Sequence, residues 1–297
     1  MAIAVLLALV SAVAYGASDF LAAVGARRLR VLRGTTVTYA FATVALLAML
    51  PIAGGAWSTE TVVWGAVAGV CAIVGFLAFY AALAAGPMSL ASPLIAVVGS
   101  VLPVAVAVAL GERLEALAWV GIVLALVGGA LISAVRRAGT PGIPPRTVVL
   151  SLVAGVGLGG SFVALDRAPA DSGVTSAVVE IAVGLLLLGA VLLAVRRWPT
   201  VRRALGVLDD EDDARPQPTV WRARLASATG GILLGVSNGL VVLALQAGSL
   251  AIVSVLVGLY PVVTILLAAI VHKERMTALQ LLGVVCALAA SVLLATA

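Results

Sequence analysis

Residues 86–115 read GPMSLASPLIAVVGSVLPVAVAVALGERLE, and residues 248–277 read GSLAIVSVLVGLYPVVTILLAAIVHKERMT. The two stretches align without a gap. The alignment pairs glycine with glycine, serine with serine and Glu-Arg with Glu-Arg: Gly86 and Gly248, Ser92 and Ser254, Glu112-Arg113 and Glu274-Arg275. Shared Ala, Val and Leu carry little weight in an apolar chain. The matched Gly, Ser and Glu-Arg positions therefore indicate an internal duplication.

The composition of the whole chain is that of a membrane protein. It is 63% hydrophobic and only 10% charged, with a mean hydropathy of +1.23. A soluble domain is about a quarter charged, and apolar runs of roughly 20 residues are long enough to cross a bilayer. The net charge of +5 does not indicate a nucleic-acid partner, because the basic residues lie between apolar runs instead of clustering with aromatic residues on one surface.

The apolar runs predict an all-α membrane protein with ten transmembrane helices. The expected helices are 2–24, 34–54, 62–85, 90–110, 116–135, 147–166, 173–195, 225–246, 250–271 and 277–296. They divide into a five-helix repeat over 1–135, a linker over 136–146, and a second five-helix repeat over 147–297. The second repeat contains one long loop, 196–224, whose acidic run 209–213 indicates a solvated linker.

The charge distribution predicts how the helices are oriented. All but two of the 18 Lys and Arg residues lie in the odd-numbered loops; the exceptions are Arg113 and Arg167. Basic residues favour the cytoplasmic side, so both termini are expected outside. Because five is an odd number, the two repeats must cross the membrane in opposite senses. Inverted repeats with a midplane site between them are typical of secondary transporters.

Two motifs, each present in both halves, resemble those of a known family. Residues 15–20 read YGASDF with an echo in LGGSF at 158–162, and Ser254, Pro261 and the Glu274-Arg275 pair mark the end of the second repeat's fourth helix. This pattern resembles the ten-helix EamA-type members of the drug/metabolite transporter superfamily. Gly99 stands where that family has a proline, and Tyr15 stands where it usually has tryptophan. The resemblance implies transport of small metabolites without specifying which.

Two carboxyl groups lie inside the expected spans. Asp19 and Glu180 are each about 12 Å from a helix end, and an ionisable group at such a depth is a functional hypothesis by default. Removal from water disfavours the charged form of a carboxyl group. Either residue could therefore carry a proton across the membrane or hold the amine of a substrate. The alternative for each is a structural carboxyl that hydrogen-bonds to neighbouring hydroxyls.

Neutral polar side chains provide further candidates for substrate contacts. They are Ser237, Asn238, Ser254, Tyr260, Tyr39 and Tyr15. For each hydroxyl the alternative is a hydrogen bond back to its own helix. Trp64 and Tyr80 are expected to be interfacial anchors.

The sequence does not predict a nucleotide-binding or metal-binding site. Residues 155–160 contain a formal G-x-G-x-x-G, but it lies inside a span with no strand before it, so small residues at a helix contact explain it better. The chain has no Walker A motif, so we expect no ATP-binding partner. With the single histidine His272 and no cysteine pair, no cofactor or metal site is expected. Cys71 and Cys286 are expected to be free thiols.

The sequence therefore predicts a secondary or facilitative transporter in the cytoplasmic membrane. We expect it to export small metabolites (amino acids, amphipathic or cationic compounds) by alternating access, with protons as a second substrate. No catalytic residue is expected. A channel or a sensory membrane protein is the alternative, although neither charged rings nor a filter segment is visible; an integral-membrane enzyme would need a cluster of catalytic residues. One chain holds both repeats, so a monomer or weak homo-oligomer is expected.

Overall fold

A computed structural model describes residues 2–26, 31–85, 88–133, 144–198, 201, 220–272 and 277–296. Its helices are α1 (Ala2–Ala26), α2 (Val31–Ala53), α3 (Thr59–Ala85), α4 (Met88–Ala109), α5 (Ala116–Ser133), α6 (Pro145–Asp166), the short η1 (Ala170–Ser172), α7 (Thr175–Arg197), α9 (Val220–Ala247), α10 (Leu250–Val257), α11 (Tyr260–His272) and α12 (Ala278–Thr296). The acidic run 209–213, Lys273 to Arg275, most of the expected linker and the side chain of His272 lie outside the described residues.

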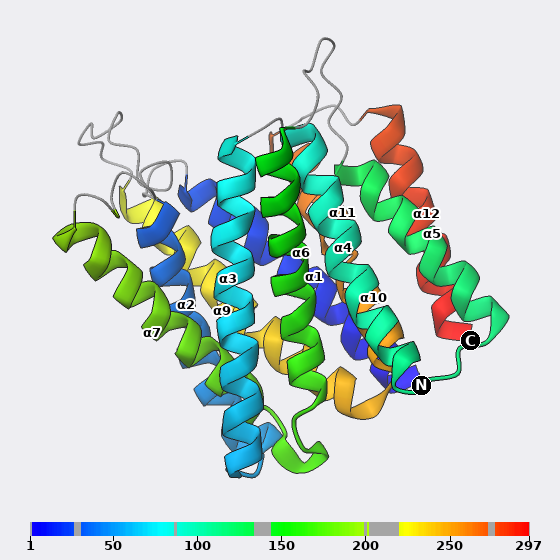
Figure 1. The fold of residues 1–297 in the computed structure, drawn as a ribbon, viewed down its shortest axis with the longest axis horizontal. Coiled ribbons are helices and arrows are strands. Elements are labelled where there is room, and N and C mark those ends of the chain that lie inside the picture. Colours follow the sequence, from blue (N-terminus) through cyan, green and yellow to red (C-terminus); the bar gives the residue numbers. More distant parts are fainter. Residues whose placement is uncertain are drawn as a thin grey trace.

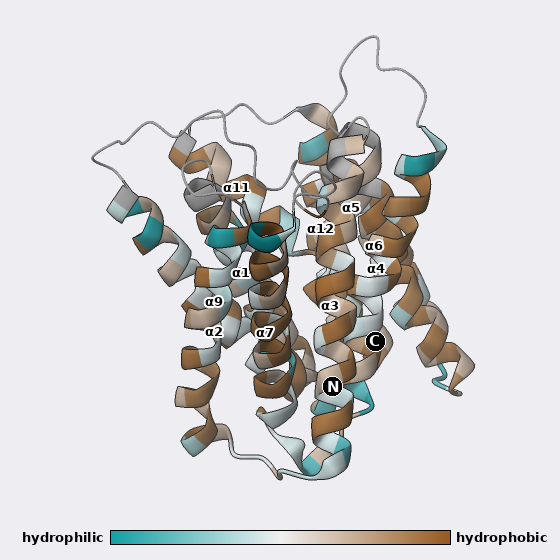
Figure 2. Ribbon diagram, turned by 60° about the vertical axis from the view of Figure 1, so that its left-hand side comes forward, coloured by the Kyte–Doolittle hydropathy of each residue, from teal (hydrophilic) through white to brown (hydrophobic). Residues whose placement is uncertain are grey.

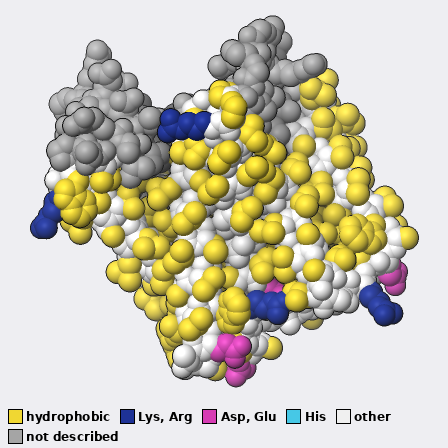
Figure 3. Space-filling view, viewed as in Figure 1, with side chains coloured by type: hydrophobic (Ala, Val, Ile, Leu, Met, Phe, Trp, Pro, Cys, Tyr) yellow, Lys and Arg dark blue, Asp and Glu magenta, His cyan; other side chains and the backbone are white. Residues whose placement is uncertain are grey.

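The expectation of a ten-helix membrane protein is confirmed. Eight apolar stretches of the described chain are long enough to span a bilayer, α10 and α11 together forming one of them, and two shorter apolar helices are Leu94–Ala109 and Ala116–Ile132. Hydrophobic residues dominate the middle of the helices (Figure 2), and in one face of the molecule the described charged side chains lie near the edges (Figure 3). α9 begins at Val220, earlier than the expected 225.

The helices form one bundle in which the two halves interlock. α1 packs along α9, and α6 packs along α3 in the same way; α2 packs on α7, and α5 packs on α12. Both chain ends lie at the end of the bundle that also holds the connections from α2 to α3, α6 to α7 and α9 to α10 (Figure 1). We call this end the terminus side. α1 therefore runs away from the terminus side and α6 runs toward it, as an inverted repeat requires.

Equivalent glycines allow the helices of the two halves to approach closely. Gly69 on α3 and Gly231 on α9 occupy matched positions in the repeat alignment. A Cβ at Gly69 would lie 2.6 Å from the carbonyl oxygen of Glu180 on α7, and a Cβ at Gly231 would overlap the carbonyl oxygen of Thr38 on α2. Small residues at helix contacts let backbones meet where lipid provides no hydrophobic driving force. The duplication is therefore visible in packing as well as in sequence.

The fourth helices of the two repeats differ in one respect. The expected helix 250–271 is split into α10 and α11, with a turn at Gly258 and Leu259. Pro261 has no N–H to donate to the carbonyl of Val257, which is the usual cause of a helix break. The matching position in α4 is Gly99, and α4 continues through it. The expectation of one continuous ninth helix is therefore wrong.

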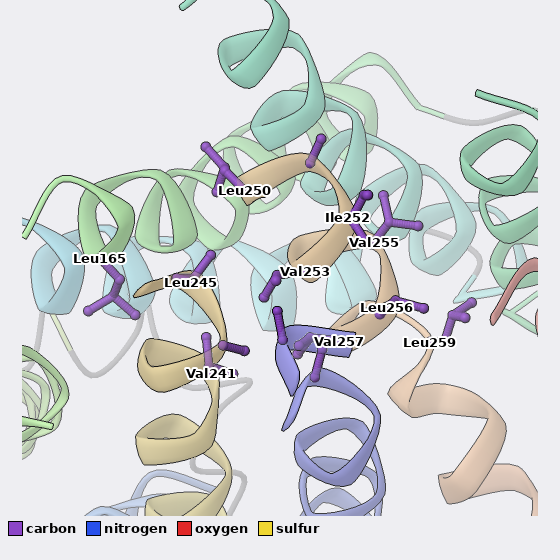
Figure 4. Close-up of a cluster of buried hydrophobic side chains, with 14 of the residues drawn as sticks. Leu165, Val241, Leu245, Leu250, Ile252, Val253, Val255, Leu256, Val257 and Leu259 are labelled. Atoms are coloured by element: carbon purple, nitrogen blue, oxygen red, sulfur yellow. The ribbon is translucent and has the colours of Figure 1, made fainter. Parts of the chain in front are cut away.

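α10 is buried on all sides. Each of its eight residues is buried, and Figure 4 shows its apolar side chains directed toward several neighbouring helices. Its first turn is capped by Ser249, whose hydroxyl accepts a hydrogen bond from the Ile252 N–H. The Glu112 carboxylate accepts hydrogen bonds from the Ser249 hydroxyl (2.6 Å) and from the Leu250 N–H (3.1 Å). A carboxylate at a helix N-terminus is stabilising.

The turns on the terminus side are tied to one another. The Ala56 N–H donates to the carbonyl of Asp171 (2.9 Å), which joins the α2–α3 turn to the α6–α7 turn. From α9, the Gln246 amide donates to the Ser172 hydroxyl and to the Gly173 carbonyl, both at 3.0 Å. Together with the Glu112 contacts to α10, these bonds form what we call the terminus-side network. They connect turns from both halves at this end of the bundle.

Candidate functional site

All four tyrosines of the chain come together inside the bundle, although they lie on four different helices. Tyr15 is on α1, Tyr39 on α2, Tyr80 on α3 and Tyr260 on α11. Each is half-buried. The charge of Asp19 acts on all four phenols, and the charge of Glu180 acts on Tyr15 and Tyr39. We call these six residues the tyrosine–carboxyl cluster.

Asp19 is the more accessible of the two carboxyl groups. It lies one helical turn after Tyr15, and residues four apart share one face of a helix. Its side chain is half-buried, and no hydrogen bond to it is found among the described residues. Within the described part of the chain, its oxygen atoms are therefore available to a ligand.

Glu180 is enclosed, with 4% of its surface exposed. The Ser161 hydroxyl on α6 donates a 2.7 Å hydrogen bond to its Oε1 atom. Its Oε2 atom is buried and has no hydrogen-bond partner within the part of the chain that the structure describes. An unsatisfied buried oxygen is costly to the fold, and such a group in a native protein calls for an explanation in terms of function.

Close helix packing positions the groups around Glu180. One turn after Glu180, a Cβ at Gly184 would lie 2.6 Å from Cε1 of Tyr39. The absence of a side chain at Gly184 thus lets the ring of Tyr39 lie directly against α7. Gly65 and Gly69, which form a G-x-x-x-G stretch on α3, bring that helix equally close to α7. Helices from both repeats therefore hold Glu180 in place.

The break between α10 and α11 places Tyr260 beside Tyr15. Their ring centroids are 4.7 Å apart with the planes inclined at 52°. The contact depends on Gly16, since a Cβ there would lie 2.5 Å from the Tyr260 carbonyl oxygen. The Thr264 hydroxyl donates to the Gly16 carbonyl (3.1 Å), which fixes α11 on α1.

Tyr80 was expected to be an interfacial anchor, and the structure places it in the cluster. Its ring packs edge-on against Phe79 (5.3 Å between centroids, 80°) and against Phe76 (4.7 Å, 61°). Both phenylalanines precede it on α3, so the ring is held from its own helix. The three aromatics at 76, 79 and 80 were the only signal in the sequence that this part of the span differs from its apolar surroundings.

Three further candidate residues take part in helix packing. The Ser237 and Ser11 hydroxyls lie 2.8 Å apart and hydrogen-bond across the α1–α9 contact. The Asn238 amide donates to the Leu234 carbonyl of its own helix (3.0 Å). The Ser254 hydroxyl donates to the Ala251 carbonyl, also within its own helix (3.2 Å). The tyrosine–carboxyl cluster includes none of the three.

Two other features lie apart from the cluster. A small hollow between α4, α5 and α10 is lined mainly by apolar residues, with Ser100 as its polar side chain. Within the described part of the chain, no group of three or more His, Cys, Asp or Glu side chains could hold a metal ion. The cluster is thus the one place among the described residues where two buried-span carboxyl groups meet several aromatic hydroxyls.

Comparison with known proteins agrees with this architecture. A family model described as the EamA-like transporter family matches residues 2–134 and 145–296. These segments correspond to α1–α5 and α6–α12. A solved crystal structure of a protein superposes with a TM-score of 0.69 at 19% identity, covering 98% of this chain and 95% of that chain. At that identity the likeness shows the fold alone. No curated protein sequence matches the chain.

Proposed function

The chain belongs to the EamA-like transporter family, and we propose that it is a secondary transporter that exports a small solute across the cytoplasmic membrane by alternating access. The observation that carries this proposal is the composition of the tyrosine–carboxyl cluster. Asp19, Tyr15, Tyr39 and Tyr80 come from the first repeat, and Glu180 and Tyr260 come from the second. A site shared between inverted repeats is where a secondary transporter binds its substrate.

We infer from the terminus-side network that the transporter is closed at the terminus side and open at the opposite end in this conformation. Hydrogen bonds join the turns at that end, whereas Asp19 and the four tyrosines keep part of their surface exposed. Transport then requires the network to open while the opposite end closes. If the charge distribution orients the chain as the sequence predicts, the network closes the outer side, and the cluster is accessible to substrate from the cytoplasm.

Glu180 is the proton site of this proposal. Its unpartnered Oε2 atom is suited to carry a proton, and Ser161 holds the other oxygen in place. The titratable groups that its charge reaches are Tyr15 on α1, Tyr39 on α2 and Cys71 on α3. None of these is cationic, so no described side chain neutralises an ionised Glu180. A proton or a substrate cation must do so.

The test is transport in proteoliposomes with an imposed pH gradient, against a panel of amino acids and cationic drugs. Wild type is compared with Glu180→Gln and Asp19→Asn. The matched controls are Glu60→Gln and Glu115→Gln, which change exposed carboxyl groups outside the cluster and outside the terminus-side network. We expect the two cluster variants to lose substrate-driven proton movement and the two controls to keep it. Solute movement that ignores both the gradient and the cluster variants would leave a facilitator with two structural carboxyl groups.

A further inference from the structure

The chemistry of the tyrosine–carboxyl cluster restricts the kind of solute it can hold. Its hydrogen-bond donors are phenol hydroxyls, and its charged groups are two carboxylates. No arginine or lysine is among the described groups that act on Asp19 or Glu180. Phosphates and carboxylates are bound through Arg and Lys side chains, so an anionic group finds no counter-charge among the described residues of the cluster.

We propose that the substrate is a small organic monocation whose charged group lies between the Asp19 carboxylate and the faces of Tyr15, Tyr80 and Tyr260. This inference rests on the proposed transport function and narrows its substrate class. It excludes zwitterions such as ordinary amino acids, because their carboxylate would lie beside Asp19 and the phenols without a cationic partner among the described residues.

The geometry of the rings supports this assignment. Tyr15 and Tyr260 are inclined at 52° with centroids 4.7 Å apart, so the two faces form a corner and are not stacked flat against each other. Tyr80 is held by Phe76 and Phe79. A cation within about 6 Å of aromatic faces is attracted by their quadrupoles. Ring positions that are fixed before binding reduce the entropy lost on binding.

The two carboxyl groups are not equivalent toward such a cation. Asp19 is half-buried, and no hydrogen bond to it is found among the described residues, so a ligand can reach it. Glu180 is enclosed, and Ser161 already occupies one of its oxygens. Asp19 is therefore the counter-ion of the substrate. Glu180 is the proton site, and it releases or takes up its proton when a cation enters or leaves the cluster.

The experiment is equilibrium binding to the purified full chain in detergent, which does not require transport. The probes are choline and the tetraalkylammonium ions from tetramethyl to tetrapropyl. Each is measured alone and in competition with 3,3-dimethylbutan-1-ol, the neutral isostere of choline, and with glycine betaine, its zwitterionic relative. We expect at least one ammonium ion to bind saturably and the neutral and zwitterionic compounds to compete at least tenfold more weakly.

Variants assign the binding to the cluster. Asp19→Asn is expected to weaken binding at least tenfold, since it removes a charge-assisted contact. Tyr260→Leu and Tyr80→Leu are expected to weaken it by about tenfold, whereas Tyr260→Phe and Tyr80→Phe, which keep the ring, stay within about threefold. Glu115→Gln, which changes an exposed carboxyl group, serves as the control, and size-exclusion chromatography shows whether each variant is folded.

The outcomes separate this inference from the proposed function. Failure of every ammonium probe, equal binding of the neutral isostere, or indifference of binding to the aromatic variants would overturn the cation assignment. If neutral or anionic solutes then move across the bilayer, the chain remains a transporter with a different substrate. If an ammonium ion binds as expected but no solute moves, the cation site stands and the transport function fails.

Discussion

Ser161 on α6 donates a 2.7 Å hydrogen bond to Oε1 of Glu180 on α7, and Oε2 of the same carboxyl group has no partner in the described chain. The pair joins two neighbouring helices of the second repeat at the point where they meet the tyrosines of the first. In the repeat alignment suggested by the sequence motifs, Ser161 corresponds to Ser18, which donates instead to a backbone carbonyl, that of Gly230 (2.8 Å). One motif position thus has a structural partner in one half and an ionisable partner in the other.

Ser161→Ala is expected to destabilise the fold by about 1–3 kcal/mol, because it leaves both oxygens of a buried carboxyl group without a donor. Ser151→Ala on the same helix is a matched control. The Ser151 hydroxyl is also buried but has no hydrogen-bond partner in the described residues, so its removal should change stability by less than about 0.5 kcal/mol. The free energy of unfolding in detergent measures both.

A double-mutant cycle with Glu180→Gln distinguishes the hydrogen bond from general packing. If Ser161 acts on Glu180, the two substitutions are non-additive, since neighbouring groups couple by about 0.5–3 kcal/mol. Strict additivity would show that Ser161→Ala acts through the α6 helix alone.

Gly16→Ala is expected to separate α1 from α11. The new methyl group would lie 2.5 Å from the Tyr260 carbonyl oxygen and 2.7 Å from the Val263 Cβ, neither of which is the end of a flexible side chain. Overpacking of this kind costs about 1–3 kcal/mol. Gly129→Ala on α5 is the control, because nothing lies within 4 Å of the added carbon, and better helix propensity should stabilise it by up to about 1 kcal/mol.

The same two variants test whether the Tyr15–Tyr260 contact matters for ligand binding. Gly16→Ala should weaken ammonium binding in parallel with stability, whereas Gly129→Ala should leave it unchanged. Full affinity in a destabilised Gly16→Ala protein would contradict the role given to this contact.

The sequence predicted the number of helices, their duplication and the two carboxyl groups inside the spans. The length of an apolar run and the position of Asp19 or Glu180 within its run are properties of a single segment, so they can be found in the sequence without knowledge of the packing. The sequence could not predict that Tyr80 lies within electrostatic reach of Asp19 or that Ser161 donates a hydrogen bond to Glu180. Helices that are apolar all round have no polar face to indicate which side turns inward, so contacts between helices depend on packing that only the structure reveals.

The break between α10 and α11 could be predicted only in part from the sequence. Pro261 and the mismatched Gly99 indicated that the fourth helices of the repeats differ. Whether a proline kinks a helix or interrupts it depends on the surroundings. Here Gly258 and Leu259 are not helical, and the interruption is accommodated because α10 is fully buried and capped by Ser249 and Glu112.

Pro261→Ala is expected to join α10 and α11 into one helix, because it restores the N–H that the Val257 carbonyl lacks. One added hydrogen bond stabilises the straight form by about 1 kcal/mol, which corresponds to roughly a fivefold slower exchange if transport needs the break to flex. Two quantities are measured for each variant: the initial transport rate in proteoliposomes and the thermal stability. Pro51→Ala, near the end of α2 and exposed, is the control. An unchanged rate would show that the break is a fixed feature and not a hinge.

Gln246→Leu is expected to open the terminus-side network, because it removes the two 3.0 Å hydrogen bonds to Ser172 and Gly173. The loss of about 1–2 kcal/mol should raise the open population about five- to thirtyfold. A cysteine at Ser254, which is 2% exposed on α10, reports on that opening once Cys71 and Cys286 are replaced by serine. Its labelling by a charged thiol reagent should accelerate in Gln246→Leu. It should stay slow in Gln280→Leu, which changes an amide in the first turn of α12, outside the terminus-side network. Equal labelling rates would mean that the network holds the turns together without controlling access, and alternating access would then need another closing element on this side.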